Sequence, residues 1–509
     1  MQGGLLKSAS AVAIIAAAGL FGASPAKAAD LGGDCCADLE ERVAELEATT
    51  VRKGNRKVSL TISGFVSTSV VFWNDGTQKD MYIGDPGNGG SRFRFVGTAK
   101  ISPQMSAGFL YEFAANANSG LASNQLNGGD RLGNSGAPQS AALAPPYQGC
   151  GNAVAATTIS ATNTSGCATV RDATVWLRHN QLGMIKVGHG STATDNLILI
   201  DVGGQGVAGT PDIALHQGGF LIRGKNSVLS GVAWNGAIRG HESFDTARRD
   251  HVLYETPTLL GFSLQAAVAN DNYWDVALRY AGEFGGFRVA AGVGYLEDTG
   301  FNAPFQQNQA AGFLCTTNCD VKSKEIKGSA SVMHVPTGLF VTGAAANREL
   351  SGSFSNTAAQ YSGPDVRMYH IAAGIGQNWF GIGKTVLFGE YGEHKGGLAQ
   401  LAFLGAAGYA ANPIGTGSGF CTSIDGVNTG GAASCDSKVT TWGINLVQYI
   451  DAAAMEVFVG YKNYSLSTNG FLNGPGVGAA QGGGNASLNK NAGGVNDMSA
   501  VMAGAKISF

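Results

Sequence analysis

The chain has few charged residues and no long apolar run in its interior. Asp, Glu, Lys and Arg make up 14% of its 509 residues, against about 25% in a typical globular protein, which argues against ordinary soluble domains. Its formal net charge of −3 does not point to a nucleic acid as partner. No internal apolar run reaches the roughly 20 residues that a membrane-spanning helix needs. If the chain crosses a membrane, it must therefore do so with strands, whose backbone polar groups are all paired.

Signals of catalysis and of ligand binding are also scarce. The eight His residues are scattered and form no H-E-x-x-H or similar metal-binding pattern. Gly383-Lys384-Thr385 resembles the end of a phosphate-binding loop, but Asn378 replaces the first Gly and the segment has the pattern of a turn between strands. The sequence therefore predicts no enzyme, no cofactor and no bound metal. A Ser-His-Asp hydrolase stays open as an alternative, because such triads are recognised by geometry rather than by order.

The N-terminus has the pattern of a secretory signal. Lys7 provides a short positive segment, residues 11–21 are apolar, and Ala26-Lys27-Ala28 is an A-x-A cleavage site. We predict a signal peptide over residues 1–28, so that the mature chain begins with Ala29-Asp30. A membrane anchor is the alternative, but the apolar run is well short of the ~20 residues of a spanning helix.

Residues 29–55 form a predicted N-terminal extension. Residues 38–47 consist mainly of helix formers. Leu39, Val43 and Leu46 are spaced four and three apart, as in a coiled-coil seam. The run is too short to be stable alone. It is therefore either a helix of an oligomeric bundle or a frayed periplasmic extension.

The cysteines fit an exported protein. Apart from the adjacent Cys35 and Cys36, they fall into three close pairs, each within a segment rich in Gly, Ser, Asn and Thr: Cys150 with Cys167, Cys315 with Cys319, and Cys421 with Cys435. Zinc binding usually requires four converging ligands with C-x₂₋₄-C spacing, which one pair alone has. We therefore predict three loop disulfides in an oxidising compartment.

From residue 56 to residue 509 the pattern is that of β-strands. In residues 91–101, for example, Phe93 and Phe95 alternate with Arg92 and Arg94, so that one face is apolar and the other is charged. Sixteen such segments follow one another, an even number as in bacterial single-chain barrels. Most of their connections are alternately short and long, and the three Cys pairs fall in long ones. We therefore predict an all-β fold, a sixteen-stranded antiparallel transmembrane β-barrel.

Several fragments carry a resemblance to a known family. The last strand ends at Phe509 and resembles the assembly signal of outer-membrane barrels generally. Four further fragments occur in a matching order and spacing: residues 34–47, 57–64, 188–195 and 249–257. Over nearly the whole mature sequence, the chain resembles the general porins of alphaproteobacteria. That resemblance implies a homotrimer of sixteen-stranded barrels and a passive aqueous channel for ions and small hydrophilic solutes.

The resemblance also implies that the connection after strand five, residues 191–247, folds into the barrel and narrows it. The candidate constriction residues are acidic on this loop and basic on the polar parity of the strands: Asp195, Asp201 and Asp212 against Arg92, Arg94, Lys100, Arg178, Arg249, Arg279 and Arg288. Opposed acidic and basic walls would orient solutes and bias ion passage. The loop is longer than the family pattern, and an extra hairpin around Val228–Arg239 would change the strand count.

The resemblance has consequences for partners as well. Ala29-Asp30 resembles the N-terminal pair that is joined covalently to peptidoglycan in some alphaproteobacterial barrels; the alternative is that it is only what the signal peptidase leaves. Outer-membrane lipid and lipopolysaccharide are expected around the barrel. Two other functions remain open. One is a substrate-selective channel with a saturable site, and the other is a structural barrel that tethers the outer membrane to peptidoglycan.

Overall fold

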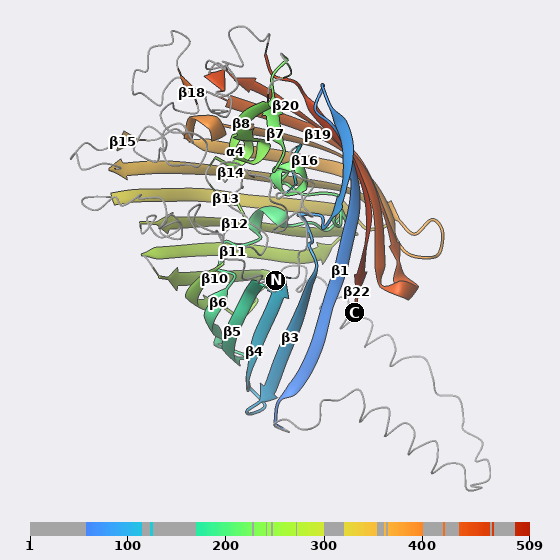
Figure 1. The fold of residues 1–509 in the computed structure, drawn as a ribbon. Helices are drawn as coiled ribbons and strands as arrows, with labels where there is room; N and C mark the ends of the chain where they lie inside the picture. Colours follow the sequence, from blue (N-terminus) through green and yellow to red (C-terminus); the bar gives the residue numbers. More distant parts are fainter. Residues whose placement is uncertain are drawn as a thin grey trace, which may run out of the picture.

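Figure 1 shows the computed structural model of the chain, in which strands lie side by side around a barrel. The structure describes residues 57–114, 123–125, 169–225, 227, 229–240, 242–245, 248–270, 272–299, 320–353, 361–362, 365–400, 421–422, 437–468, 471–472 and 494–509. The predicted signal peptide, the N-terminal extension and five of the six paired cysteines lie outside these residues. Cys421 belongs to the short strand β18 (Cys421–Thr422), which pairs with β21 (Phe471–Leu472).

Sixteen strands form the barrel wall. They are β1 (Ser59–Asn74), β3 (Arg92–Lys100), β4 (Met105–Ala114), β5 (Thr169–His179), β6 (Gly183–Gly190), β9 (Arg249–Glu255), β10 (Phe262–Ala269), β11 (Tyr273–Phe284), β12 (Phe287–Asp298), β13 (Asp320–His334), β14 (Leu339–Ser353), β16 (Val366–Gln377), β17 (Thr385–Lys395), β19 (Ser437–Ile450), β20 (Met455–Thr468) and β22 (Met498–Ser508). The main sheet also includes two short strands, β2 (Lys79–Gly84) beside β1 and β15 (Tyr361–Ser362) beside β14.

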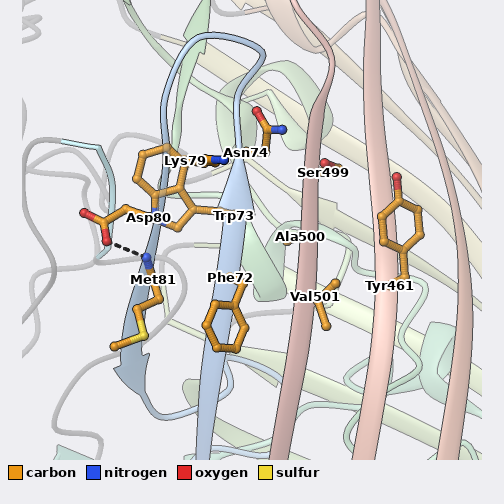
Figure 2. Close-up of a pocket in the computed structure, with 10 residues that line it drawn as sticks. All are labelled: Phe72, Trp73, Asn74, Lys79, Asp80, Met81, Tyr461, Ser499, Ala500 and Val501. Atoms are coloured by element: carbon orange, nitrogen blue, oxygen red, sulfur yellow. Dashed lines mark hydrogen bonds between the residues drawn. The ribbon is translucent and has the colours of Figure 1, made fainter.

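Each wall strand pairs antiparallel with its neighbours, and the ring closes at β1. One edge of β1 pairs with β3 and β2, and the other pairs with β22 over Phe65–Asn74. Figure 2 shows this seam, where β1, β2, β22 and β20 run together and Phe72 and Val501 line a shallow outer pocket of about 420 Å³. Because the ring is closed, the wall has no unpaired strand edge. The predicted sixteen-stranded barrel is confirmed.

The two faces of the wall differ as the sequence pattern predicts. On β19, the side chains of Val439 and Val447 are buried inside, whereas Trp442 and Ile444 are 45% and 57% exposed on the outside. Large apolar side chains are exposed in the same alternation on the other wall strands. A closed wall with an apolar outer face is the structure that lets strands cross a bilayer. No described helix is both long and apolar enough to cross a membrane.

The connections between wall strands differ sharply in length at the two ends of the barrel. Gly285 and Gly286 alone connect β11 to β12, with φ of 57° and 80°. A two-residue hairpin turn of this kind requires positive φ at both positions, which glycine adopts without strain. Short turns at Pro103, Leu182, Pro336 and Asp451 also lie between consecutive wall strands. Short turns at one end and long loops at the other indicate that the short-turn end faces the periplasm.

The connection between β6 and β9 carries elements of its own. These are the 3₁₀ turn η2 (Leu197–Leu199), helix α3 (Ala214–Gln217), strands β7 (Leu221–Arg223) and β8 (Leu229–Ala233), and helix α4 (Trp234–Arg239). β7 and β8 pair with each other in a separate sheet. A hairpin is therefore present, but it spans residues 221–233 rather than Val228–Arg239, because residues 234–239 form helix α4, and it adds no strand to the wall.

Candidate pore constriction

The connection of residues 191–248, called here the inner loop, begins on the inner face of β11. The carboxylate of Asp275 accepts hydrogen bonds from the backbone N–H groups of Ala193 and Thr194, at 3.2 and 2.8 Å. Arg279, four residues further along the same strand and on the same face, donates to the carbonyl oxygens of Ala193 and Asp195, both at 2.8 Å. The first turn of the inner loop is thus held against the wall by one acidic and one basic side chain.

The loop then crosses β12 and β13. The Ser329 hydroxyl donates to the Leu197 carbonyl at 2.5 Å, and the Ser331 hydroxyl accepts from the Val202 N–H at 3.0 Å. Leu197 packs on β12 at Gly294, where a Cβ atom would lie 2.5 Å from the Leu197 Cδ1 atom. A larger residue at position 294 would therefore push the loop off the wall, which explains a glycine within this strand.

Further along, the loop contacts β19, β20 and Lys384, the residue before β17. Lys384 donates to the Gly203 carbonyl and the Tyr449 hydroxyl donates to the Gly204 carbonyl at 3.1 Å. The Glu456 carboxylate accepts from the Val207 N–H. The segment that resembles a phosphate-binding loop is thus a turn between β16 and β17, and its lysine supports the inner loop.

The next part of the loop packs around α3 and α4. The Asp212 carboxylate binds the Arg239 guanidinium and accepts from the Ser243 hydroxyl at 2.7 Å. Burial alone would raise the pKa of Asp212, but Arg239 and these hydrogen bonds hold it below its usual value. Burial also lowers the pKa of His216 to about 3. Asp212 is therefore a charged structural residue inside the loop.

The end of the loop is held by β13 and β14. Arg348 donates to the carbonyl oxygens of Glu242 and Ser243, both at 2.7 Å, and forms an ion pair with Glu325 at 2.6 Å. Lys327 donates to the Phe244 carbonyl at 2.7 Å and pairs with Glu325 at 2.9 Å. The loop is thus fixed to the inner wall from β11 round to β20, and it also reaches β2, where the Tyr82 hydroxyl donates to the His216 carbonyl at 3.3 Å. This leaves the inner faces of β3, β4 and β5 opposite the loop.

A cluster of arginines lies on that opposite wall. Glu112 on β4 pairs with Arg92 at 3.4 Å, with Arg171 at 3.0 Å, and with Arg94. Arg171 is the extra residue of a β-bulge, because Glu112 is opposite Asp172 while Phe113 is opposite Val170. A bulge re-aims one side chain of its strand. Here it places Arg171 on the lumen side together with Asp172.

Two carboxyl groups of the loop ends meet a fourth arginine. Asp195 lies 3.8 Å from Arg248, and Asp245 accepts from the Asn196 N–H at 2.9 Å. Burial and the nearby Asp195 charge raise the pKa of Asp245 to about 7. Although burial opposes it, Arg248 lowers the pKa of Asp195. The pair therefore keeps one carboxylate charged next to Arg248 near neutral pH.

The structure brings some of the predicted constriction residues together and separates others. Arg92 and Arg94 meet on the lumen side, and Arg279 binds the loop backbone. Arg249 pairs with Asp298 at 2.5 Å. Three other basic residues lie toward the short-turn end: Lys100 at the last position of β3, Arg178 at 3.7 Å from Glu255, and Arg288 at 3.0 Å from Glu283.

The three predicted acidic residues of the loop are each bound within the loop. The side chains of Asp195 and Asp212 are 1% and 3% exposed. Asp201 accepts hydrogen bonds from the N–H groups of Gly203, Gly204 and Gln205, each at 2.8 Å, so it shapes a turn of the loop. The sequence prediction included neither Arg171 nor Glu112. The bulge hides the first from strand parity, whereas the second lies on the inward parity of β4, between Tyr111 and Phe113, but the prediction took only basic residues from the strands.

Comparison with known families agrees with this geometry. A family model for Gram-negative porins matches residues 9–488 of the chain. The chain belongs to the Gram-negative porin family. This porin has the closed barrel of the family, is a passive channel, and is located in the outer membrane. No curated protein sequence matches it.

Solved structures similar to this porin are also outer-membrane proteins. The anion-selective porin of Comamonas acidovorans is 16% identical, with 89% of this chain and 100% of that chain covered and a TM-score of 0.47. In-vitro folded OmpT of Vibrio cholerae is 14% identical, with 90% and 100% covered and a TM-score of 0.43. Salmonella typhi OmpF in complex with daunomycin is 13% identical, with 89% and 98% covered and a TM-score of 0.41.

Proposed function

We propose that this porin is a general diffusion pore for ions and small hydrophilic solutes. Its narrowest part lies between the inner loop and the arginine-bearing wall of β3, β4 and β5. The observation that carries this proposal is the position of the inner loop, which hydrogen-bonds to the lumen side of strands from β11 to β20. A pore narrowed by a fixed loop sorts solutes by size and charge without a conformational step.

Flux measurements test this function. Liposomes that contain the purified protein should swell in uncharged sugars at a rate that rises linearly with sugar concentration and falls steadily with sugar size. Saturation of the rate at high concentration would contradict a general pore and favour a substrate-selective channel. No swelling with any sugar would favour the structural barrel. Protein-free liposomes and liposomes with heat-denatured protein are the controls.

The finer family assignment and the oligomeric state are part of the proposal. The fragments at 34–47, 57–64, 188–195 and 249–257 support the alphaproteobacterial group of general porins and, with it, a homotrimer. On the outer face of β3 and β4, the rings of Phe93 and Phe113 stack at 5.1 Å, and that of Phe95 meets Phe113 edge-on at 6.5 Å. Aromatic side chains of this kind are enriched in subunit interfaces. Native mass measurement of three chains would support the trimer, and a monomer would contradict it.

The N-terminal and cysteine assignments are proposals from the sequence. We propose that Ala29-Asp30 at the mature N-terminus is joined to peptidoglycan through the extension at 29–55. Muramidase should then be required to release the protein from cell walls.

We propose disulfides between Cys150 and Cys167, Cys315 and Cys319, and Cys421 and Cys435. Thiol labelling of the unreduced protein at any of these positions would contradict that pairing. Outer-membrane lipid and lipopolysaccharide are the expected surroundings, and we propose no catalytic role.

A further inference from the structure

Four arginines lie at one level of the inner wall. The register places Arg94 opposite Glu112, and Glu112 opposite Asp172. Arg171 is the bulged residue beside Asp172. Gly190 at the end of β6 is opposite Arg249, so Arg248, the residue before Arg249, lies at the same level of the barrel as the other three arginines. Arg92, Arg94, Arg171 and Arg248 are close enough to repel one another electrostatically. We call this group the arginine layer.

The carboxylates that compensate the arginine layer lie beneath it. The side chains of Arg92, Arg94, Arg171 and Arg248 are 21%, 35%, 23% and 22% exposed, whereas those of Glu112 and Asp195 are 4% and 1% exposed. Nearby, Asp172 accepts from the Thr174 hydroxyl at 2.5 Å and Lys186 donates to the Ser191 carbonyl at 3.1 Å; both are buried. Water in the lumen therefore meets guanidinium groups first, with the negative charges behind them.

The first thirty residues of the inner loop oppose this positive surface with a single partly exposed acid; two further partly exposed acids of the loop, Glu242 and Asp245, lie near its end. From residue 191 to residue 220, the partly exposed residues of the loop are Asn196, Leu199, Asp201, Gly204, Gly206, Gly209 and Leu215. Asp201 is the one acid among them, and its oxygens bind three backbone N–H groups of the loop. In this stretch, the loop side of the gap is thus mostly neutral.

We propose that the arginine layer makes this channel selective for small oxyanions, such as carboxylates and phosphates, over cations of similar size. This inference rests on the proposed position of the narrowest part, next to the inner loop. Guanidinium groups donate paired N–H bonds that match the geometry of carboxylate and phosphate oxygens. A cleft lined by one sign of charge, with low-dielectric walls, raises the local concentration of the opposite ion.

Glu112 is a positioning residue in this proposal. It touches three of the four arginines and is itself buried, so it holds their side chains side by side despite their repulsion. Replacing Glu112 with Gln removes the shared partner. We expect chloride preference to be kept or raised, because a negative charge is lost, while the preference of phosphate over chloride falls as the arginines separate. A residue with only a structural role would not shift these two preferences in opposite directions.

The experiment measures reversal potentials of the full-length protein in planar bilayers under a KCl gradient. The reversal potential of the wild type should have the sign that indicates a chloride-selective pore. Arg94→Gln should lower the chloride-to-potassium permeability ratio roughly two- to fivefold, as expected from removing one charge about 4–8 Å from the ion path. Arg288→Gln is the matched control, because Arg288 lies on a strand of the same barrel but beside the short turn at Gly285–Gly286. It should leave the ratio close to that of the wild type.

A second measurement needs no variant. Raising the salt from about 0.1 M to about 1 M shortens the Debye length from roughly 10 Å to roughly 3 Å, so the selectivity of the wild type should fall toward that of bulk solution. A potassium-selective wild type, or an Arg94→Gln effect no larger than that of Arg288→Gln, would overturn the proposal. Absence of any current would instead count against the diffusion pore itself, so the two failures are distinguishable.

Discussion

Removing most of the inner loop should raise the single-channel conductance of this porin roughly two- to threefold, because the loop occupies the lumen at its narrowest level. The structure offers a clean excision. The two ends of the loop meet where the Asn196 N–H donates to Asp245 at 2.9 Å. Residues 197–244 can therefore be replaced with two glycines, which keeps Asp195 and Arg248 in place.

The wall exposed by this excision is partly polar, although Phe340, Phe388 and Phe458, now buried in one core with the loop, would also meet water. Ser329 and Ser331 now bond to the loop, and both would become free to bind solvent. The matched control shortens a different long connection by deleting residues 354–360 between β14 and β15, which should leave conductance unchanged. Conductance is read from step sizes in planar bilayers. If the excised variant inserts normally and its steps are no larger than those of the wild type, the loop does not limit the pore.

Replacing Arg348 with Met should release the end of the loop and destabilise the protein. Arg348 is 1% exposed, pairs with Glu325 and donates to three loop carbonyls. The Arg348 guanidinium also lies over the Phe244 ring, 4.6 Å from the ring centroid, and this contact would change too. Removing one partner of a buried ion pair typically costs about 3–5 kcal/mol, because the other charge is left with fewer partners. We expect a lower free energy of unfolding in urea and frequent current substates as the loop moves.

Two further variants isolate the cause of this effect. Arg367 on the outer face pairs with Asp365 at 2.9 Å, but its side chain is 52% exposed. Arg367→Met should therefore cost far less stability than Arg348→Met, since exposed ion pairs are screened by water. Adding Glu325→Gln to Arg348→Met should recover part of the loss, because it removes the uncompensated carboxylate. Equal losses in the two single variants would show that Arg348 is not a buried anchor of the loop.

The barrel could be predicted from the sequence because each wall strand meets two different solvents. In β3 the alternation of Phe93 and Phe95 with Arg92 and Arg94 distinguishes the apolar outer face from the polar inner face, and the same pattern occurs in the other wall strands. Short turns such as Gly285-Gly286 are equally local, since positive φ at both positions calls for glycine. The fold therefore follows from signals that each span about ten residues.

The constriction was harder to predict because its charges are paired across long distances in the sequence. Asp212 has the residue type expected of an acid in the pore lining, but Arg239 in α4 donates hydrogen bonds to both of its carboxylate oxygens. Asp195 is likewise buried beside Arg248. Arg171 was missed because one bulged residue breaks the parity of β5. The residues that line the gap thus depend on tertiary contacts of the loop, which no local periodicity reports.

Passive diffusion through this porin requires an open aqueous passage beside a loop that is fixed inside the barrel. Current through single molecules of the purified protein in a planar bilayer measures that passage directly. We expect stepwise insertions, a linear current–voltage relation at low voltage, and a conductance that rises with salt concentration. A correctly folded barrel that inserts into the bilayer and carries no current would contradict the account.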